Sequence, residues 1–228
     1  MIHFQCASLD TCAQATGLVV AIDVLRAFST AAYAFAAGAR EIILVSTVEE
    51  ALVLREGVPG TLVMGEVDVL PVPGFDLSNS PVEISHQDLT GRRLIQRTTA
   101  GTQGVVRSRR AETILVASFC NARATAEAIQ RHSPASVTLV ITGQRPGCWG
   151  DEDAACADYL ESLLHGREPN LEPLLQRVRA SPAGRFFTDP NQPEFNPADL
   201  EYCLAVDRFD FAMPVERRDG YLVMKREA

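Results

Sequence analysis

A predicted strand, tight turn and helix start follow one another in the segment Leu94-Ile-Gln-Arg-Thr-Thr-Ala-Gly-Thr-Gln-Gly-Val-Val-Arg107. Leu94 and Ile95 supply the apolar strand. Gly101 lets the backbone turn tightly or approach a ligand closely. Thr102 is the predicted N-cap, because its hydroxyl can accept a hydrogen bond from a free helix N–H.

The turn in this stretch has the chemistry of an anion site. Free N–H groups and the positive end of the helix dipole attract anions to a helix start. Arg97, Thr98 and Thr99 add donors beside Gly101 and Thr102. The same residues are also typical of an ordinary strand-to-helix turn, so their surroundings must decide between the two interpretations.

Apolar runs and helical segments alternate along the rest of the chain. Further strands are predicted at residues 18–22, 41–45, 61–64, 113–117 and 136–141. Helices are predicted from Ser29 or Thr30 to Ala37, from the capping-box pattern at Thr47 to about Glu56, and over 122–131 and 151–164. This alternation is typical of βαβ units. We therefore expect an α/β fold with three α/β/α layers and a largely parallel or mixed central sheet.

We expect one domain over residues 1–228, with a less regular C-terminal part from about residue 166. In that part, residues 171–179 and 197–205 read as helices, and 209–213 and 221–224 as a late pair of strands. Residues 67–91 form a long irregular segment with several Pro and Gly. Loops of such length in a compact domain are usually functional or mobile.

Composition narrows the class of protein. The 228 residues are 46% hydrophobic and 22% charged, which is typical of a soluble globular chain. The formal net charge of -8 disfavours a nucleic-acid binder, which would usually present a basic face. We see neither a signal peptide nor a membrane span, and six cysteines without a CxxC pair indicate reduced thiols. We therefore expect a cytoplasmic protein.

Polar and charged side chains follow most of the predicted strands. Ligands of parallel α/β sheets bind beyond the carboxyl ends of the strands, so we expect these side chains to gather there. They are Asp23 and Arg26; Glu66, with Asp76 and Asn79 in the loop behind it; Thr98, Thr99, Gly101 and Thr102; Asn121; and Asp151, Glu152 and Asp153.

Carboxylates beside an anion turn indicate Mg²⁺ bound together with a phosphate. Mg²⁺ prefers oxygen ligands, usually one or two carboxylates with waters and substrate oxygens, and it can help to orient a nucleophilic water. Asp23, Glu66 and Asp153 are the predicted metal ligands and catalytic carboxylates. Glu152 reads at least as well as an ordinary residue of a helix's first turn. Arg26 either clamps an acid group of the substrate or pairs with Asp23.

Motifs of several other chemistries are absent from the sequence. It has no GxxxxGK[ST] phosphate loop, and no GxGxxG follows the first strand. No cysteine is followed by arginine at the spacing of a cysteine phosphatase, and the four histidines show no paired metal spacing. Residues 23–25 lack the second Asp of a DxD phosphatase turn, which weakens an aspartyl-phosphate mechanism.

Six motifs together resemble the ComB family, the 2-phosphosulfolactate phosphatases. They are Asp23-Val-Leu-Arg-Ala27, Gly65-Glu66, Gly74-Phe-Asp-Leu-Ser-Asn-Ser-Pro81, Thr98-Thr-Ala-Gly-Thr102, Ser118-Phe-Cys-Asn121 and Glu152-Asp153. The resemblance runs from about residue 18 to 165, and more weakly to the carboxyl end. It implies an α/β/α hydrolase that depends on Mg²⁺ and converts (2R)-phospho-3-sulfolactate to sulfolactate and phosphate on the coenzyme M route.

A substrate with phosphate, sulfonate and carboxylate groups needs several anion donors. Arg26, Arg97 and the turn Thr98–Thr102 are expected to share that work, and Asn79 and Asn121 complete the predicted substrate-binding set. Which carboxylate acts as the base stays open. Two alternatives also stay open: a non-catalytic module that binds a phosphorylated or sulfonated small acid, and a phosphatase of a different small phosphorylated acid. A homodimer is the default expectation for the assembly.

Overall fold

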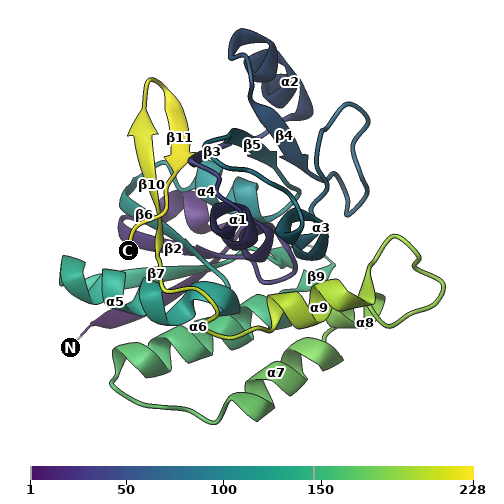
Figure 1. Cartoon of the computed structure of the whole chain (residues 1–228). Coiled ribbons are helices and arrows are strands. Elements are labelled where there is room, and N and C mark those ends of the chain that lie inside the picture. The colour runs from purple at the N-terminus through teal and green to yellow at the C-terminus, as the bar shows by residue number, and fades with distance from the viewer. Residues whose placement is uncertain (1, 146) are drawn as a thin grey trace.

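The computed structural model describes residues 2–145 and 147–228, and it contains a nine-stranded mixed sheet flanked by helices (Figure 1). The strand order is β1-β7-β2-β6-β10-β11-β3-β5-β4. The first four strands form one parallel block: β1 (His3–Ser8), β7 (Ser136–Ile141), β2 (Gly17–Ile22) and β6 (Ala111–Ala117). The last three strands form a second parallel block: β3 (Glu41–Leu44), β5 (Arg93–Arg97) and β4 (Leu62–Gly65). The α/β prediction is confirmed, and the sheet is of the mixed type.

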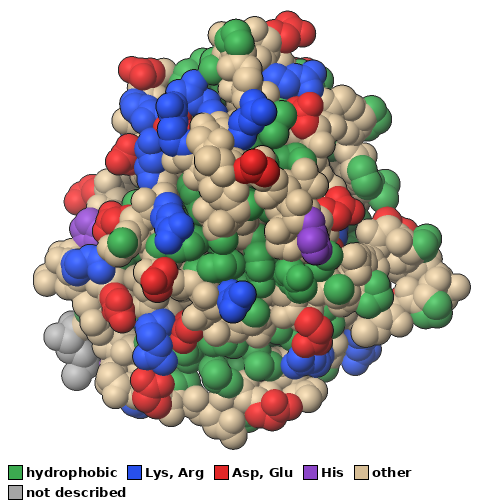
Figure 2. All heavy atoms as spheres, viewed as in Figure 1, with side chains coloured by type: hydrophobic (Ala, Val, Ile, Leu, Met, Phe, Trp, Pro, Cys, Tyr) green, Lys and Arg blue, Asp and Glu red, His purple; other side chains and the backbone are tan. Residues whose placement is uncertain are grey.

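A C-terminal hairpin joins the two parallel blocks in the middle of the sheet. Strand β10 (Met213–Arg218) pairs antiparallel with β6, and β11 (Tyr221–Met224) pairs antiparallel with β10 and with β3. Three antiparallel pairings in a row mean that the two blocks run in opposite senses across the ladder. The late strand at residues 221–224 is confirmed, and it does pair with the strand before it. The prediction of that earlier strand at 209–213 is wrong, because β10 spans Met213–Arg218 and it is residues 215–218 that pair with β11. Figure 2 shows many Lys and Arg side chains gathered over this hairpin and β3.

The helices cover the sheet and also fill the space between its two blocks. They are α1 (Ala27–Ala36), α2 (Val48–Gly57), α3 (Pro81–Ser85), α4 (Gly101–Arg107), α5 (Ala122–His132), α6 (Asp151–Leu164), α7 (Leu171–Ala180), α8 (Pro182–Phe186) and α9 (Pro197–Cys203). Short 3₁₀ turns occupy Cys12–Gln14 and Phe119–Asn121, and a small hairpin pairs Gln144–Arg145 with Cys148–Trp149. Helix α4 contacts both β2 and β3, so it lies between the blocks, and Figure 1 shows α1 there as well.

Burial on both faces explains why the apolar runs form strands. In β2, Val19 and Ala21 pack into the cluster that contains α1 and α4. Leu18, Val20 and Ile22 face the opposite way, into the cluster of α5 and α6. Alternate side chains of a strand point to opposite faces, so a run that is buried on both sides must be apolar throughout.

Two predicted helix caps are wrong, and in both cases a group earlier in the chain takes over the capping role. Helix α1 begins at Ala27, before Ser29 and Thr30, because the Asp23 carboxylate accepts a hydrogen bond from the Ala27 N–H at 2.9 Å. Helix α4 begins at Gly101, and Thr98 Oγ1 accepts from the Thr102 N–H at 3.0 Å. Thr47 caps α2 as predicted.

The irregular segments contain more structure than the pattern predicted. Strand β1 and helix α3 were both missed, because β1 lies partly exposed at the sheet edge and α3 is a single short turn. Among the described residues, no helix is long and apolar enough to cross a membrane. Five cysteines are free thiols, and the side chain of Cys148 lies outside the described set.

Candidate active site

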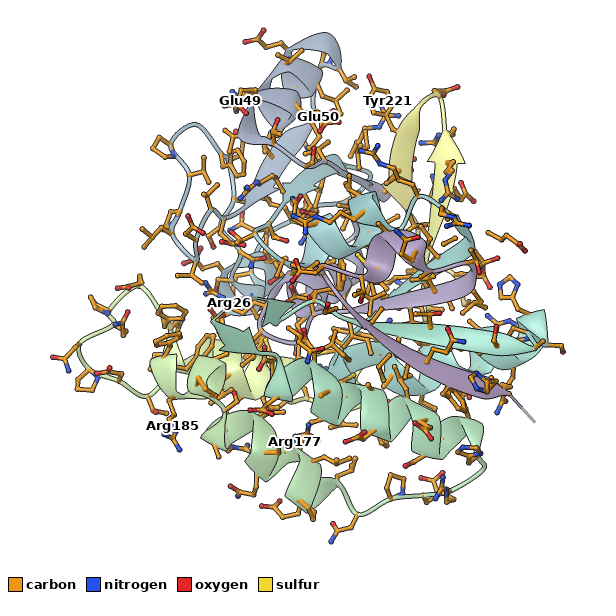
Figure 3. All side chains as sticks on the ribbon, turned by 180° about the vertical axis from the view of Figure 1, so that it is seen from behind. Arg26, Glu49, Glu50, Arg177, Arg185 and Tyr221 are labelled. Carbon is orange, nitrogen blue, oxygen red and sulfur yellow. The ribbon has the colours of Figure 1, made fainter. Side chains whose placement is uncertain are left out.

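A cavity of about 300 Å³ lies where β2, β4, β5 and β7 end. Its polar walls come from both parallel blocks and its apolar wall from the C-terminal helices. The lining residues are Asp23, Glu66, Glu152 and Asp153; Arg26, Asn79 and Thr99; and an apolar set that includes Leu25, Val69, Pro182, Ala183, Phe186, Phe187 and Phe195. Figure 3 labels Arg26 above the C-terminal helices.

Asp23 lies directly after β2 and is only 6% exposed. Burial raises the pKa of its carboxyl to about 6, and the nearby Glu66 carboxylate adds to the rise. Oδ2 lies 3.3 Å from the Thr142 hydroxyl. A Cβ at Gly101 would lie 2.8 Å from the same oxygen, so only glycine lets the start of α4 approach Asp23 this closely. The turn therefore faces a carboxylate rather than open solvent.

Glu152 and Asp153 open helix α6 after the left-handed Gly150. Asp153 accepts hydrogen bonds from the Val24 N–H at 2.8 Å and the Gly143 N–H at 2.7 Å, and so ties the two turns together. Burial beside Glu152 and Asp23 raises its pKa. The pKa of Glu152 is raised to about 7, first by burial and then by repulsion from Asp23. Its carboxylate lines the cavity and makes no hydrogen bond to another side chain among the described residues.

Glu66 fastens the loop after β4 to the turn after β5. Its Oε1 accepts from the Thr99 N–H at 2.6 Å, and its Oε2 accepts from the Val69 N–H at 2.6 Å and the Thr99 hydroxyl at 2.9 Å. Thr99 Oγ1 in turn accepts from the Asp68 N–H at 2.7 Å. The Thr99 N–H, which was predicted to donate to a bound anion, therefore donates to the Glu66 carboxylate in this structure.

Arg26 is held in a fixed position at the cavity wall. One terminal nitrogen donates to Asp199 Oδ2 at 2.7 Å, and the guanidinium lies 5.5 Å and 5.4 Å from the ring centroids of Phe187 and Phe195. Asp199 is fully buried and also accepts from the Ser80 hydroxyl at 2.6 Å. The partner of Arg26 is thus Asp199, and the predicted alternative of a pair with Asp23 is not formed.

The remaining predicted residues divide into those at the cavity and those behind it. Asn79 lines the cavity, and its buried Oδ1 has no hydrogen-bond partner in the described chain. Thr98 and Thr102 bond to each other and lie outside the lining. Arg97 donates to the backbone carbonyl of Glu66 at 2.8 Å. The Asn121 side chain accepts from the Ser118 N–H at 3.1 Å, within the capping turn before α5, and lies outside the lining too.

Glu152 was not among the predicted metal ligands or catalytic carboxylates, and no residue of the C-terminal part was predicted at the site. Glu152 looks like a helix-start acid, and its signal was only its position beside Asp153. Asp199 stands in the first turn of α9, where acids are common, so nothing in the pattern marks it as a partner of Arg26. Phe187 and Phe195 come to the site only through the packing of α8 and the segment after it.

The charge in the cavity is unbalanced. Four carboxylates line it, and Arg26 is the one cationic side chain in the described part of the lining. Within the described residues no group of three or more His, Cys, Asp or Glu side chains is arranged to hold a metal ion by itself. A buried set of like charges with a single cationic neighbour is costly, even where backbone N–H groups donate to some of the carboxylates.

The fold and the cavity together define an α/β protein with an acidic pocket beyond the ends of its strands. The family model for 2-phosphosulpholactate phosphatase matches residues 5–217. A probable 2-phosphosulfolactate phosphatase of Bacillus subtilis is 35% identical over 88% of this chain and 87% of its own length. Another, of Carboxydothermus hydrogenoformans, is 34% identical over 91% and 90%. The chain therefore belongs to the 2-phosphosulfolactate phosphatase family of phosphoric monoester hydrolases.

Proposed function

We propose that this protein is a Mg²⁺-dependent phosphatase that hydrolyses (2R)-phospho-3-sulfolactate, or a similar small phosphorylated 2-hydroxy acid, to the hydroxy acid and phosphate. Membership of the family supports the reaction and the class of substrate. The observation that carries the proposal is the cavity where Asp23, Glu152 and Asp153 meet opposite Arg26. An alternative module that only binds anions would have no use for these crowded carboxylates.

The donors present fit Mg²⁺. Four carboxylates line the cavity, and a cation that offsets their charge would favour the entry of an anionic substrate. Asp23 and Glu152 are the ligands we favour, since both face the cavity with raised pKa values that a divalent cation would lower. Glu66 and Asp153 remain predicted ligands, although backbone N–H groups bond to both oxygens of each, whereas in Asp23 a backbone N–H bonds to Oδ1 and Oδ2 lies 3.3 Å from the Thr142 hydroxyl. When bound, the ion would offset phosphate charge and help to orient water.

The chain's own groups would do the rest of the work. Arg26, held by Asp199 between two phenylalanine rings, presents its remaining N–H donors to an acid group of the substrate. Glu152 or Asp23 can hold a proton near neutral pH, as a group that activates water must. Glu66 and Asp153 fix the turns around the cavity. Phe187 and Phe195 keep water from the Arg26 side of the site.

Phosphate release by the purified protein tests the proposal. The panel is phosphosulfolactate, phospholactate, phosphoglycerate and an aryl phosphate, each with Mg²⁺ and with EDTA. We expect Mg²⁺-dependent release that is fastest on phosphosulfolactate. Faster metal-dependent release on another ester would keep the chemistry and change the substrate. A folded protein that releases phosphate from none of them would favour the binding module.

We also propose that the enzyme works in the cytoplasm, as a homodimer, and on the coenzyme M route. Five unbridged cysteines support a reducing compartment. The route follows from the proposed substrate alone. Light scattering and fractionation of cells test the first two proposals directly.

A further inference from the structure

A cluster of cations surrounds a second buried carboxylate, far from the cavity described above. Glu41, at the start of β3, is only 1% exposed. Its Oε1 accepts from Arg93 Nε at 2.5 Å and from Arg40 at 3.2 Å, and its Oε2 accepts from Arg218 at 2.7 Å and from Lys225 Nζ at 2.5 Å. One negative charge thus meets four positive ones, which leaves a surplus of positive charge in a small volume.

This surplus lies beside open space. Arg40, Arg93 and Arg218 line a cavity of about 190 Å³, and Arg40, Arg92 and Arg93 line an adjoining one of about 320 Å³. Arg93 bonds Glu41 through Nε, so both of its terminal amino groups remain for another partner. Arg92 forms no salt bridge among the described residues, and the Asp88 carboxylate is close enough to interact with it electrostatically. Asp219, on the hairpin turn, is the acidic residue among the lining side chains that the structure describes.

The smaller cavity also has an apolar floor. Ile43, Leu54, Val58 and Val223 line it, and Tyr221, which is 39% exposed, stands at its edge. Figure 3 labels Tyr221 on the hairpin, well away from Arg26. Arginines around an apolar floor suit a ligand with an anionic group at one end and an aromatic or aliphatic body at the other.

The cluster lies at the opposite end of the strands from the acidic cavity. Arg40 precedes β3 and Arg93 begins β5, whereas Glu66 and Thr99 follow the carboxyl ends of β4 and β5. Strands of this length place the two ends roughly 15 Å apart. A ligand at the arginines would therefore leave the acidic cavity open.

We propose that the cleft formed by Arg40, Arg92, Arg93 and Arg218 is a second anion site, which binds a small organic phosphate with at least two negative charges. The phosphate groups lie against the guanidinium groups of Arg40, Arg92 and Arg93, which donate to phosphate oxygens in pairs. The body of the ligand lies on the floor beside Tyr221. The net charge of -8 on the whole chain makes this local excess of positive charge a specific feature rather than a general property.

Calorimetric titration in EDTA tests the site, because without metal the four carboxylates repel anions from the acidic cavity. The probes are ADP, pyrophosphate and adenosine. We expect ADP to bind more tightly than pyrophosphate, adenosine not to bind, and affinity to fall as salt is raised. The double variant Arg40→Gln/Arg92→Gln should weaken ADP binding about tenfold, since two charged contacts are lost.

Two control variants each remove one positive charge at another place in the protein. Arg131→Gln, from an exposed pair with Glu227, and Arg26→Gln, at the acidic cavity, should leave ADP binding within about twofold. No binding by the wild-type protein, or loss of binding in Arg26→Gln with full binding in the double variant, would overturn the proposal. Equal affinity for pyrophosphate and ADP would overturn the part of the proposal in which the body of the ligand lies on the apolar floor.

Discussion

Asp23 and Glu41 are both carboxylates buried at strand ends, yet their surroundings are opposite. Asp23 lies with Glu66, Glu152 and Asp153 at one cavity, and burial with repulsion raises its pKa to about 6. Glu41 lies among three arginines and a lysine, whose hydrogen bonds overcome the cost of burial and hold its pKa well below the usual range. Asp23 shares its cavity with three other carboxylates and one arginine, whereas Glu41 has four cationic partners for a single negative charge.

The difference separates a group kept for binding from a group kept for folding. A buried carboxylate with cationic partners in the protein stabilises one arrangement of the chain. A buried carboxylate without such partners is typical of a site that binds a ligand. If the proposed function is right, Asp23 and its neighbours should lower the stability of the protein when no cation is bound.

Asp23→Asn should lower kcat/KM for phosphosulfolactate by about a thousandfold or more, because it removes the charge of a proposed metal ligand. The fold should survive, since the amide occupies the same volume and carries no charge to bury. Steady-state kinetics with Mg²⁺ measure the loss, and circular dichroism checks the fold. Turnover at the wild-type rate would remove Asp23 from the site.

Glu41→Gln should lower the free energy of unfolding by about 3 kcal/mol, because it leaves four cations without their shared carboxylate. Urea unfolding measures the change, and kcat at low temperature should stay near the wild-type value. Glu201→Gln is the matched control, since its pair with Arg179 is exposed and should contribute less than about 1 kcal/mol. Equal losses in the two variants would contradict the role given to Glu41.

The pH dependence of stability should differ between the two regions. The folded pKa values of Asp23 and Glu152 are raised, so their protons bind more tightly in the folded state. Their stabilising effect is present below about pH 4 and is lost as pH rises through 6 to 7. The lowered pKa of Glu41 has the opposite sign, so its contribution is present above about pH 4.5 and is lost as pH falls below that value.

In EDTA, the wild-type protein should therefore lose about 2 kcal/mol of stability between pH 5 and 8. Mg²⁺ should reduce this loss, and Asp23→Asn should flatten the slope. Urea unfolding across the pH range measures all three. A metal-free protein whose stability rises steadily from pH 5 to 8 would contradict the strain assigned to the acidic cavity.

Arg26→Lys should raise KM for phosphosulfolactate about tenfold with little change in kcat, because an ammonium keeps the charge but loses the paired donors. The ammonium group of the lysine would still lie beside Asp199 and the two phenylalanine rings. A change in kcat alone, with KM unaltered, would place Arg26 at the chemical step rather than at binding.

Local patterns predicted the strands because each apolar run is buried on both faces, as in β2. They could not predict that the C-terminal hairpin inserts between β6 and β3, because the partners of a strand are set by long-range packing. Asp23, Glu66 and Asp153 all line the cavity, as predicted. The rule for parallel strands does not explain why Glu66 joins the other two, because β4 lies in the block that runs opposite to β2. The rule could not tell that Thr98 and Thr102 bond to each other, or that Asp199 arrives from α9 to hold Arg26.

The proposed function requires a divalent cation in the acidic cavity. Calorimetric titration of the metal-free protein with Mg²⁺ at pH 7.5 measures this binding. We expect saturable binding that is lost in Asp23→Asn and unchanged in Glu41→Gln. Absence of Mg²⁺ binding to the folded wild-type protein, or equal binding by Asp23→Asn, would contradict it.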